Sequence, residues 1–221
     1  MGDPVTPRSS DWNRFWKADK INASDRVSWS KRRMIRVLEP FAREGKKVLD
    51  AGCGSGFFAK YFCDHQMETV ALDYSEDALR IARQKTGGRV RTVRADLLTK
   101  DVVDAVGSRF DVIFSDGLLE HFSGGDQDTI MRHFIQMLAE DGVVITFVPN
   151  RWSPWQLIRP FFMPGIDETP FVLRDLTALN RRHGLRVLEQ GGINVVPFPC
   201  SPDALLGGIF GMLLFTVASK T

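Results

Sequence analysis

Several features are scarce in this sequence, and each scarcity excludes a class of protein. The 221 residues include three cysteines, Cys53, Cys63 and Cys200, which form no C-x-x-C pair, so we expect neither a disulfide framework nor a metal site. No apolar run approaches the ~20 residues that span a membrane, and the polar N-terminus does not resemble a signal peptide. The formal net charge of +2 is too small to indicate a nucleic-acid partner. These absences predict a globular protein of the reducing cytoplasm.

The strongest positive signal is a glycine-rich turn that follows a short apolar run. Asp50 comes near the end of that run, and Gly52, Gly54 and Gly56 follow at alternate positions. Phe57 then begins an apolar stretch whose spacing predicts a helix. Glycines in such a strand–turn–helix unit adopt backbone angles that are closed to other residues, and they let a ligand lie against the main chain. We therefore predict a ligand site at this turn.

The acid before the turn indicates the charge of the ligand. The dinucleotide fingerprint G-x-G-x-x-G seats a pyrophosphate on a helix N-terminus, but here Phe57 occupies the place of its third glycine. Asp50 would repel a pyrophosphate, and it would attract a ligand with a cationic end, such as an ammonium beside a sulfonium. These two residues argue against a nicotinamide-dependent oxidoreductase.

This stretch closely resembles motif I, D/E-x-G-x-G-x-G, of the class I S-adenosylmethionine (SAM) methyltransferases. The resemblance implies that Asp50 anchors the methionine ammonium of SAM and that the three glycines let the main chain approach the cofactor. It also implies that Asp96 takes the adenine amino group, while the backbone amide of Leu97 serves a ring nitrogen. S-adenosylhomocysteine would be the product.

A second acid is placed to bind a ribose. The predicted strand 69–73 ends on Asp73, 17 residues after Gly56. Strand ends line the ligand crevice of an open parallel sheet, and a carboxylate there can accept two hydrogen bonds from a ribose diol. Tyr74 follows, and two roles stay open for it: packing against the adenine or an ordinary surface position.

Strand-like and helix-like segments alternate between residues 45 and 219, which predicts an α/β protein with helices on both faces of one sheet. Seven strands are predicted, at about 47–51, 69–73, 90–94, 110–114, 143–148, from 185 onward and at 212–219. The resembled family has a Rossmann-like, seven-stranded, mostly parallel sheet whose last strand inserts antiparallel next to the fifth. We expect one SAM-binding domain over residues 45–221.

The segment from Ser115 to Phe122 resembles the methyltransferase region that faces the methionine part of SAM and the acceptor, so Ser115 is a predicted cofactor contact. His121 is the best candidate for a general base, because imidazole takes a proton near neutral pH; it could instead only cap or orient the segment. Glu120 is expected to hold the loop. The N/D-P-P-Y/F motif of enzymes that methylate base or glutamine amides is missing.

Two further regions are predicted to flank the cofactor and acceptor sites. Residues 1–44 carry helical patterns at about 12–16 and 25–39 and are interpreted as a helical cap or lid, with simple packing on the body as the alternative. The basic run Lys31-Arg32-Arg33 in the second helix is expected to be a solvated face. Residues 149–170, rich in aromatics and proline, are interpreted as an acceptor-binding insertion with an apolar lining, or else as a surface flap.

The sequence therefore predicts SAM-dependent methyl transfer to a small, apolar or aromatic acceptor, at an O, N, C or S atom. No nucleic acid and no integral membrane association are expected, although the apolar residues around 198–214 leave room for shallow membrane contact. Two alternatives stay open: an RNA or protein methyltransferase, and a SAM-binding module without catalysis.

Overall fold

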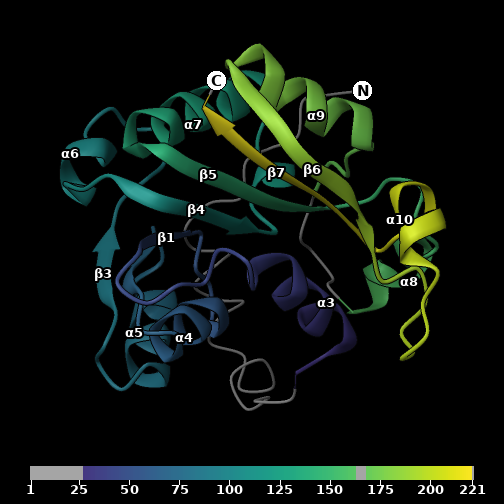
Figure 1. The fold of residues 1–221 in the computed structure, drawn as a ribbon, viewed down its shortest axis with the longest axis horizontal. Helices are drawn as coiled ribbons and strands as arrows, with labels where there is room; N and C mark the ends of the chain where they lie inside the picture. The colour runs from purple at the N-terminus through teal and green to yellow at the C-terminus, as the bar shows by residue number, and fades with distance from the viewer. Residues whose placement is uncertain (1–26, 163–167, 221) are drawn as a thin grey trace.

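A computed structural model describes residues 27–162 and 168–220. Its centre is one seven-stranded sheet with the strand order β3-β2-β1-β4-β5-β7-β6 (Figure 1). The strands are β1 (Lys47–Ala51), β2 (Glu68–Asp73), β3 (Arg91–Arg94), β4 (Phe110–Asp116), β5 (Leu138–Pro149), β6 (Leu185–Ile193) and β7 (Leu213–Lys220). The first five are parallel, and β7 lies antiparallel between β5 and β6. The predicted Rossmann-like fold, including the antiparallel last strand, is confirmed.

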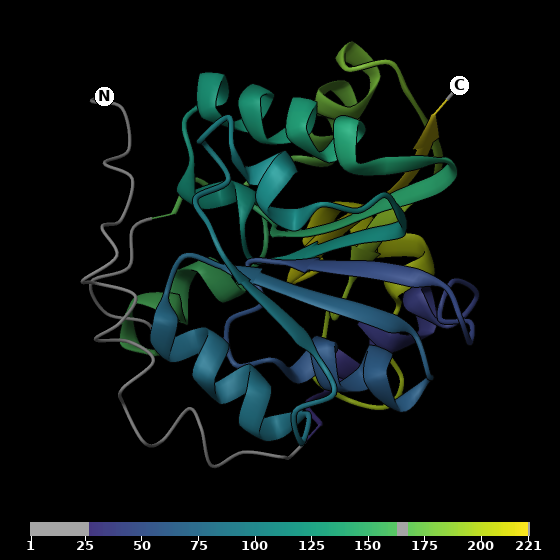
Figure 2. The same cartoon turned by 90° about the vertical axis from the view of Figure 1, so that its left-hand side faces the viewer.

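Helices cover both faces of the sheet (Figures 1 and 2). One face carries α3 (Trp29–Leu38), α4 (Phe57–Asp64) and α5 (Glu76–Lys85); the other carries α6 (Val102–Val106), α7 (Gly124–Met137) and α9 (Leu173–Arg182). The short 3-10 helix η1 (Leu119–His121), α8 (Trp155–Phe162) and α10 (Asp203–Phe210) complete the described elements. None of the described helices has the length and apolar content needed to cross a bilayer.

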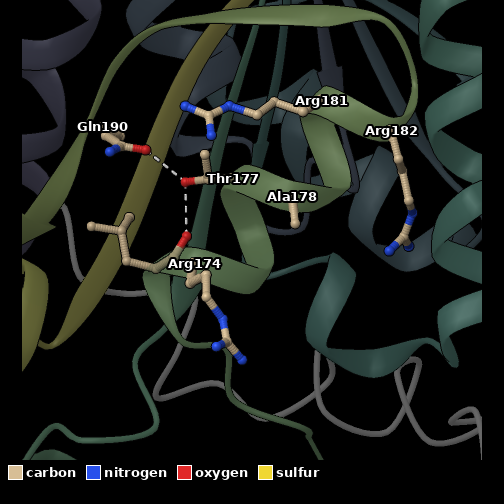
Figure 3. Close-up of a pocket in the computed structure, with 7 residues that line it drawn as sticks. Arg174, Thr177, Ala178, Arg181, Arg182 and Gln190 are labelled. Carbon is tan, nitrogen blue, oxygen red and sulfur yellow. Dashed lines mark hydrogen bonds between the residues drawn. The ribbon is translucent and has the colours of Figure 1, made fainter.

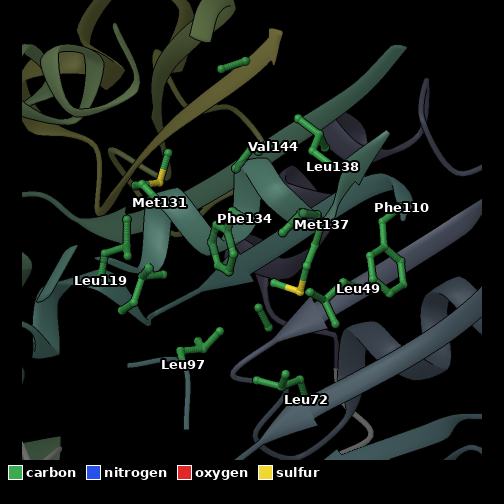
Figure 4. Packing of buried hydrophobic residues seen from close by; sticks show 14 of the residues in the cluster. Leu49, Leu72, Leu97, Phe110, Leu119, Met131, Phe134, Met137, Leu138 and Val144 are labelled. Carbon is green, nitrogen blue, oxygen red and sulfur yellow. The ribbon is translucent and has the colours of Figure 1, made fainter. Parts of the chain in front are cut away.

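Alternation along the strands builds the two cores. In β1, Val48 packs toward α3 and α4 while its neighbour Leu49 packs toward α7, since successive strand residues point to opposite faces. Figure 4 shows the second of these cores, where Phe134 and Met137 of α7 meet Leu49. Both faces being covered explains why the middle strands are continuous apolar runs.

Side-chain caps determine where several helices begin. Ser75 Oγ accepts a hydrogen bond from the backbone N–H of Ala78, as expected from the acids that follow it. Ser28 caps α3 in the same way, so this helix begins at Trp29 rather than at about residue 25. Ser123 caps α7, which begins at Gly124.

Two helices lie where irregular chain was predicted. One is α8, inside the 149–170 insertion; the other is α10, inside the glycine- and proline-rich stretch 191–211. Glycines lower helix propensity and so hide α10 from a sequence pattern, yet Gly207 is needed there. A Cβ on Gly192 of β6 would lie 1.9 Å from Gly207 O, because the helix backbone rests directly on the strand. In addition, β5 begins at Leu138, before the predicted start at about residue 143.

The N-terminal helix α3 is held to the far edge of the sheet by Arg33. Its guanidinium lies 2.7 Å from Asp203 Oδ2, and it donates to Asn194 Oδ1 at 2.7 Å and to the carbonyl of Phe198 at 2.6 Å. Arg33 is buried, so the expectation of a solvated basic face is wrong for this residue and holds only for exposed neighbours such as Arg32. The helix predicted at residues 12–16, and with it much of the predicted cap, lies outside the described residues.

Candidate functional site

Asp50 lies beneath the glycine-rich turn at the carboxyl end of the central strand β1. Its neighbours across the sheet are Ala71 of β2 and Phe114 of β4, which leave its side chain only 2% exposed. Among the described residues, nothing hydrogen-bonds to Asp50 Oδ2. A buried carboxylate oxygen without a partner is costly, so this one is poised for a donor that the described residues do not supply.

The glycines of the turn have distinct tasks. Gly52, Gly54 and Gly56 all have positive φ angles, of 70°, 49° and 69°. Gly52 and Gly54 line the cavity beside Asp50, whereas Gly56 does not. Gly56 is the N-cap of α4, and a Cβ on it would lie 2.5 Å from the Cα of Ala82 in α5. This third glycine therefore allows α4 and α5 to pack closely.

Gly56→Ala is expected to lower the free energy of unfolding by about 3 kcal/mol, since it combines a strained φ with a clash against backbone. Gly87→Ala is the matched control: its φ is 62°, but nothing lies within 4 Å of the added Cβ, so only about 1 kcal/mol should be lost. Urea denaturation of both variants measures the difference. Equal losses would show that the contact with Ala82 is unimportant.

Asp73 joins the end of β2 to the glycine turn. One of its carboxylate oxygens accepts from the backbone N–H of Gly54 at 3.0 Å, and the other accepts from that of Ser75 at 2.9 Å. Burial raises the pKa of Asp73, and these two N–H groups act against that rise. The carboxylate is thus fixed at the rim of the turn, with the lone pairs that remain available to hydroxyl donors.

One cavity of about 520 Å³ brings most of the predicted site residues together. Its walls include Asp50, Gly52, Gly54, Asp73, Tyr74, Asp96, Leu97 and His121. Gly56 and Ser115 are not among them; Ser115 is fully buried, and its hydroxyl lies 3.4 Å from that of Thr146.

Further charged residues that had no assigned part in the site also line the cavity. They are Lys31, Lys85, Asp116, Arg159 and Glu168. Asp116 ends β4, and the strand-end rule that identified Asp73 applies to it equally. The others arrive through tertiary contacts, for which the local sequence has no signal.

The cavity floor favours a cationic ligand. Burial and the neighbouring charge of Asp116 raise the pKa of Asp50 to about 8, against the backbone N–H of Ala59, which lowers it. Burial also raises the pKa of Asp116 to about 7, with Lys31 acting in the opposite direction. A positive ligand group placed beside Asp50 and Asp116 would stabilise their charged forms and offset the cost of burying them.

Comparison with known proteins decides which ligand this is. Residues 26–190, most of the chain, match the protein family described as "Methyltransferase domain". The chain belongs to the class I SAM-dependent methyltransferases. SAM is therefore the cofactor of this methyltransferase domain.

Individual relatives agree with the family. A probable S-adenosylmethionine-dependent methyltransferase of Mycobacterium tuberculosis is 30% identical over 135 residues, which cover 60% of this chain and 44% of that protein. A ubiquinone biosynthesis O-methyltransferase of Sinorhizobium medicae is 28% identical over 52% of this chain and 49% of that protein. The chain thus spans about half the length of these curated relatives.

A solved structure with the same fold is the N-methyltransferase NodS from Bradyrhizobium japonicum in complex with S-adenosyl-L-homocysteine. The two share a TM-score of 0.70 at 16% identity, over 96% of this methyltransferase chain and 97% of that one.

The residues present in the methyltransferase cavity fit SAM. The unpartnered oxygen of Asp50 suits the ammonium group, since a buried carboxylate needs a charged donor. Asp73 suits the ribose hydroxyls, and Asp96 and Leu97 lie on the wall further along. Asp96 is exposed, and its Oδ1 already accepts from the backbone N–H of Leu98 at 2.9 Å.

The other end of the methyltransferase cavity is built by η1, α8 and the chain after the undescribed residues. Glu120 and His121 come from η1, and Arg159 of α8 lies 3.1 Å from Glu168 Oε1. Burial raises the pKa of Glu120 well above its usual range. The predicted insertion thus reaches the cavity with Trp155 as well as with charged groups.

Much of the apolar surface of the insertion faces outward. Leu157 and Phe161 of α8 are 80% and 84% exposed, and Leu205 of α10 is 85% exposed. Asn150, in the chain before α8, donates to the carbonyls of Ile209 and Gly211 at the end of α10, so that chain is tied to the end of α10.

A separate groove lies on α9 and β6 (Figure 3). It shares no lining residue with the methyltransferase cavity. Thr177 spans it, with its hydroxyl 2.8 Å from Leu173 O and 2.6 Å from Gln190 Oε1, and Arg182 at its end pairs with Asp128. These contacts are internal to the fold, and we assign the groove no ligand.

Proposed function

We propose that this domain transfers the methyl group of SAM to a small, apolar or aromatic acceptor. The observation that carries the proposal is the continuity of one cavity from Asp50, under the glycine turn, to His121 and Trp155 at its other end. A cofactor held by Asp50 and an acceptor beside His121 would therefore share one cavity.

The chain's own contribution is binding and alignment. Asp50 would hold the ammonium, Asp73 the ribose, and Asp96 with the amide of Leu97 the adenine, as the family resemblance implies. Tyr74 lines the same wall and would pack against the adenine. Ser115 does not line the cavity, so it would support the residues of the wall without direct contact with the cofactor. When bound, SAM supplies a methyl group that needs no further activation, so alignment and exclusion of water are the main tasks of the protein.

The acceptor class is inferred from the walls and from the named relatives. Phe57, Phe58 and Trp155 offer aromatic surface beside the charged groups. The Sinorhizobium medicae relative is named an O-methyltransferase and NodS an N-methyltransferase, so the relatives leave the methylated atom open. His121 would serve as the general base if the acceptor carries a proton on the methylated atom.

Two measurements test the proposal. Calorimetric titration should show SAM binding with no comparable binding of NADH. Incubation of cell extracts with the protein and methyl-labelled SAM, followed by mass spectrometry, should reveal a labelled small molecule. Label only in RNA or protein would favour those acceptors, and SAM binding without any transfer would favour a non-catalytic module.

SAM affinity should also depend on pH. Asp50, with a pKa of about 8 before cofactor is added, is protonated at pH 6 and must lose that proton to pair with an ammonium. We expect the dissociation constant to fall by up to about tenfold per unit between pH 6 and 7.5, below the range where an α-amino group itself deprotonates. Calorimetry in buffers of different ionisation enthalpy should detect proton release. A flat profile would remove Asp50 from the ammonium contact.

A further inference from the structure

The acceptor end of the cavity gathers three side chains of a kind that bind metals. Ligand atoms of Glu120, His121 and Glu168 all lie within 4.8 Å of one another. Glu120 and His121 are 2% and 6% exposed. Ligands bound to one cation at about 2.1 Å in tetrahedral geometry are about 3.4 Å apart, so side-chain rotations that close the farthest pair by up to about 1.4 Å would let all three reach a single ion.

An unpartnered buried oxygen sets this cluster apart from an ordinary acidic surface. Among the described residues, Glu120 Oε2 is buried and has no hydrogen-bond partner. Glu168 Oε1 likewise lacks a hydrogen bond, although Arg159 lies 3.1 Å away. Buried carboxylates are normally paired or coordinate a metal, and here one cation side chain faces two carboxylates.

The backbone holds the two glutamates next to each other. The N–H of Thr169 donates to the carbonyl of Glu120 at 2.8 Å, which joins the chain around Glu168 to η1. The ligands therefore come from two segments separated by 46 intervening positions in sequence but fixed by a main-chain bond. Such a preformed pair loses little entropy when it binds an ion.

The charge of the whole cavity points the same way. The described lining includes six carboxyl groups but only the three cationic side chains Lys31, Lys85 and Arg159. SAM brings a net single positive charge to this excess of acid. A divalent cation at the acceptor end would balance the rest.

We propose that Glu120, His121 and Glu168 bind one divalent cation beside the site of methyl transfer. One imidazole with two carboxylates suits Mn²⁺ or Zn²⁺ better than the all-oxygen shells of Mg²⁺ or Ca²⁺. Three protein ligands leave coordination positions open toward the cavity, where an acceptor with an oxygen donor would bind. The role toward the acceptor rests on the proposed function, but the cation site itself does not.

This inference differs from the sequence-based expectation of no metal site, which considered only cysteine spacing. It also changes the predicted part of His121, because an imidazole that ligates a cation cannot take the acceptor's proton through the same nitrogen. The two roles are therefore distinguishable by experiment.

The test is a titration of the chelator-treated full chain with Mn²⁺, followed by the loss of the free-ion signal in electron paramagnetic resonance. One Mn²⁺ per chain should bind, and Zn²⁺ should displace it. Glu120→Gln and Glu168→Gln should each weaken binding at least ~10-fold, because even the loss of an outer partner of a ligand costs that much. Glu189→Gln, on the exposed part of β6, is the matched control and should bind Mn²⁺ normally.

The outcome separates the two proposals. A thermal denaturation curve shows whether each glutamine variant is folded. If one of them misfolds, the other still tests the cation site by itself. Binding in the unmodified chain that is no tighter than in the folded variants would overturn the cation site. SAM is titrated into the same preparations: SAM binding without cation binding removes only the metal, and cation binding without SAM binding removes only the proposed function.

Discussion

Asp50→Asn is expected to weaken SAM binding by roughly 100- to 1,000-fold. Removing one member of a buried charge pair costs about 2–5 kcal/mol, and each 1.4 kcal/mol is a factor of ten. Asparagine keeps the size of the side chain and one carbonyl oxygen, so the loss reports the charge that faces the ammonium. Adenosine, which has no ammonium, should bind the variant and the unmodified chain equally. An equal loss for adenosine would mean that the variant disturbs the turn as a whole.

In the absence of SAM, the same variant should be more stable than the unmodified domain at pH 8. The pKa of Asp50 is raised from its ordinary value of 3.8 to about 8 in the fold, so the unfolded chain releases this proton first and stability falls as pH rises from about 4 to 8. Asparagine has no proton to lose, and we expect a gain of up to about 5 kcal/mol at pH 8 that vanishes near pH 4. Urea denaturation at both pH values measures it, with the exposed Asp104→Asn as control. A gain that is the same at both pH values would contradict the assignment.

Asp73→Ala is expected to lose both cofactor affinity and stability. Two charge-assisted hydrogen bonds to a ribose account for a roughly 30- to 100-fold loss of SAM affinity. The N–H groups of Gly54 and Ser75 lose their acceptor as well, which should lower the free energy of unfolding by about 2 kcal/mol.

Adenosine binding again shows which contact a variant has lost, but here the affinity for adenosine is expected to fall. Adenosine carries the ribose, so its affinity should fall as far as that of SAM in Asp73→Ala, whereas Asp50→Asn spares it. Calorimetry with both ligands on both variants makes a complete cycle. Unchanged SAM affinity in a folded Asp73→Ala domain would refute the ribose contact.

The parts of the fold that local chemistry determines were predictable from the sequence. Apolar runs marked the buried strands, and the order of acid and glycines from Asp50 to Gly56 marked the cofactor end of the cavity. Each of these signals lies within about ten residues, and each has a single physical cause. The task of Gly56 was not predicted: the motif implied that it lets the main chain approach the cofactor, whereas it packs helices and does not line the cavity.

The acceptor end was not predictable in this way. Glu168 carries no local pattern, and only the hydrogen bond between Thr169 and Glu120 brings it to η1. Lys31 looked like part of a solvated run, but α3 turns it toward the cavity. The helix α10 was hidden because its glycines, which weaken helix propensity, are required by its contact with Gly192.

The Arg33 clamp has a consequence for how the domain assembles during synthesis. Its partners Asn194 and Asp203 leave the ribosome some 160 residues after Arg33 itself. Until then α3 lacks its buried anchor, and the wall of the cavity that carries Lys31 stays incomplete, so a nascent chain holds the glycine turn long before it holds a finished binding site. A finished cofactor site therefore requires the chain to be synthesised through Asp203, long after the glycine turn itself has been made.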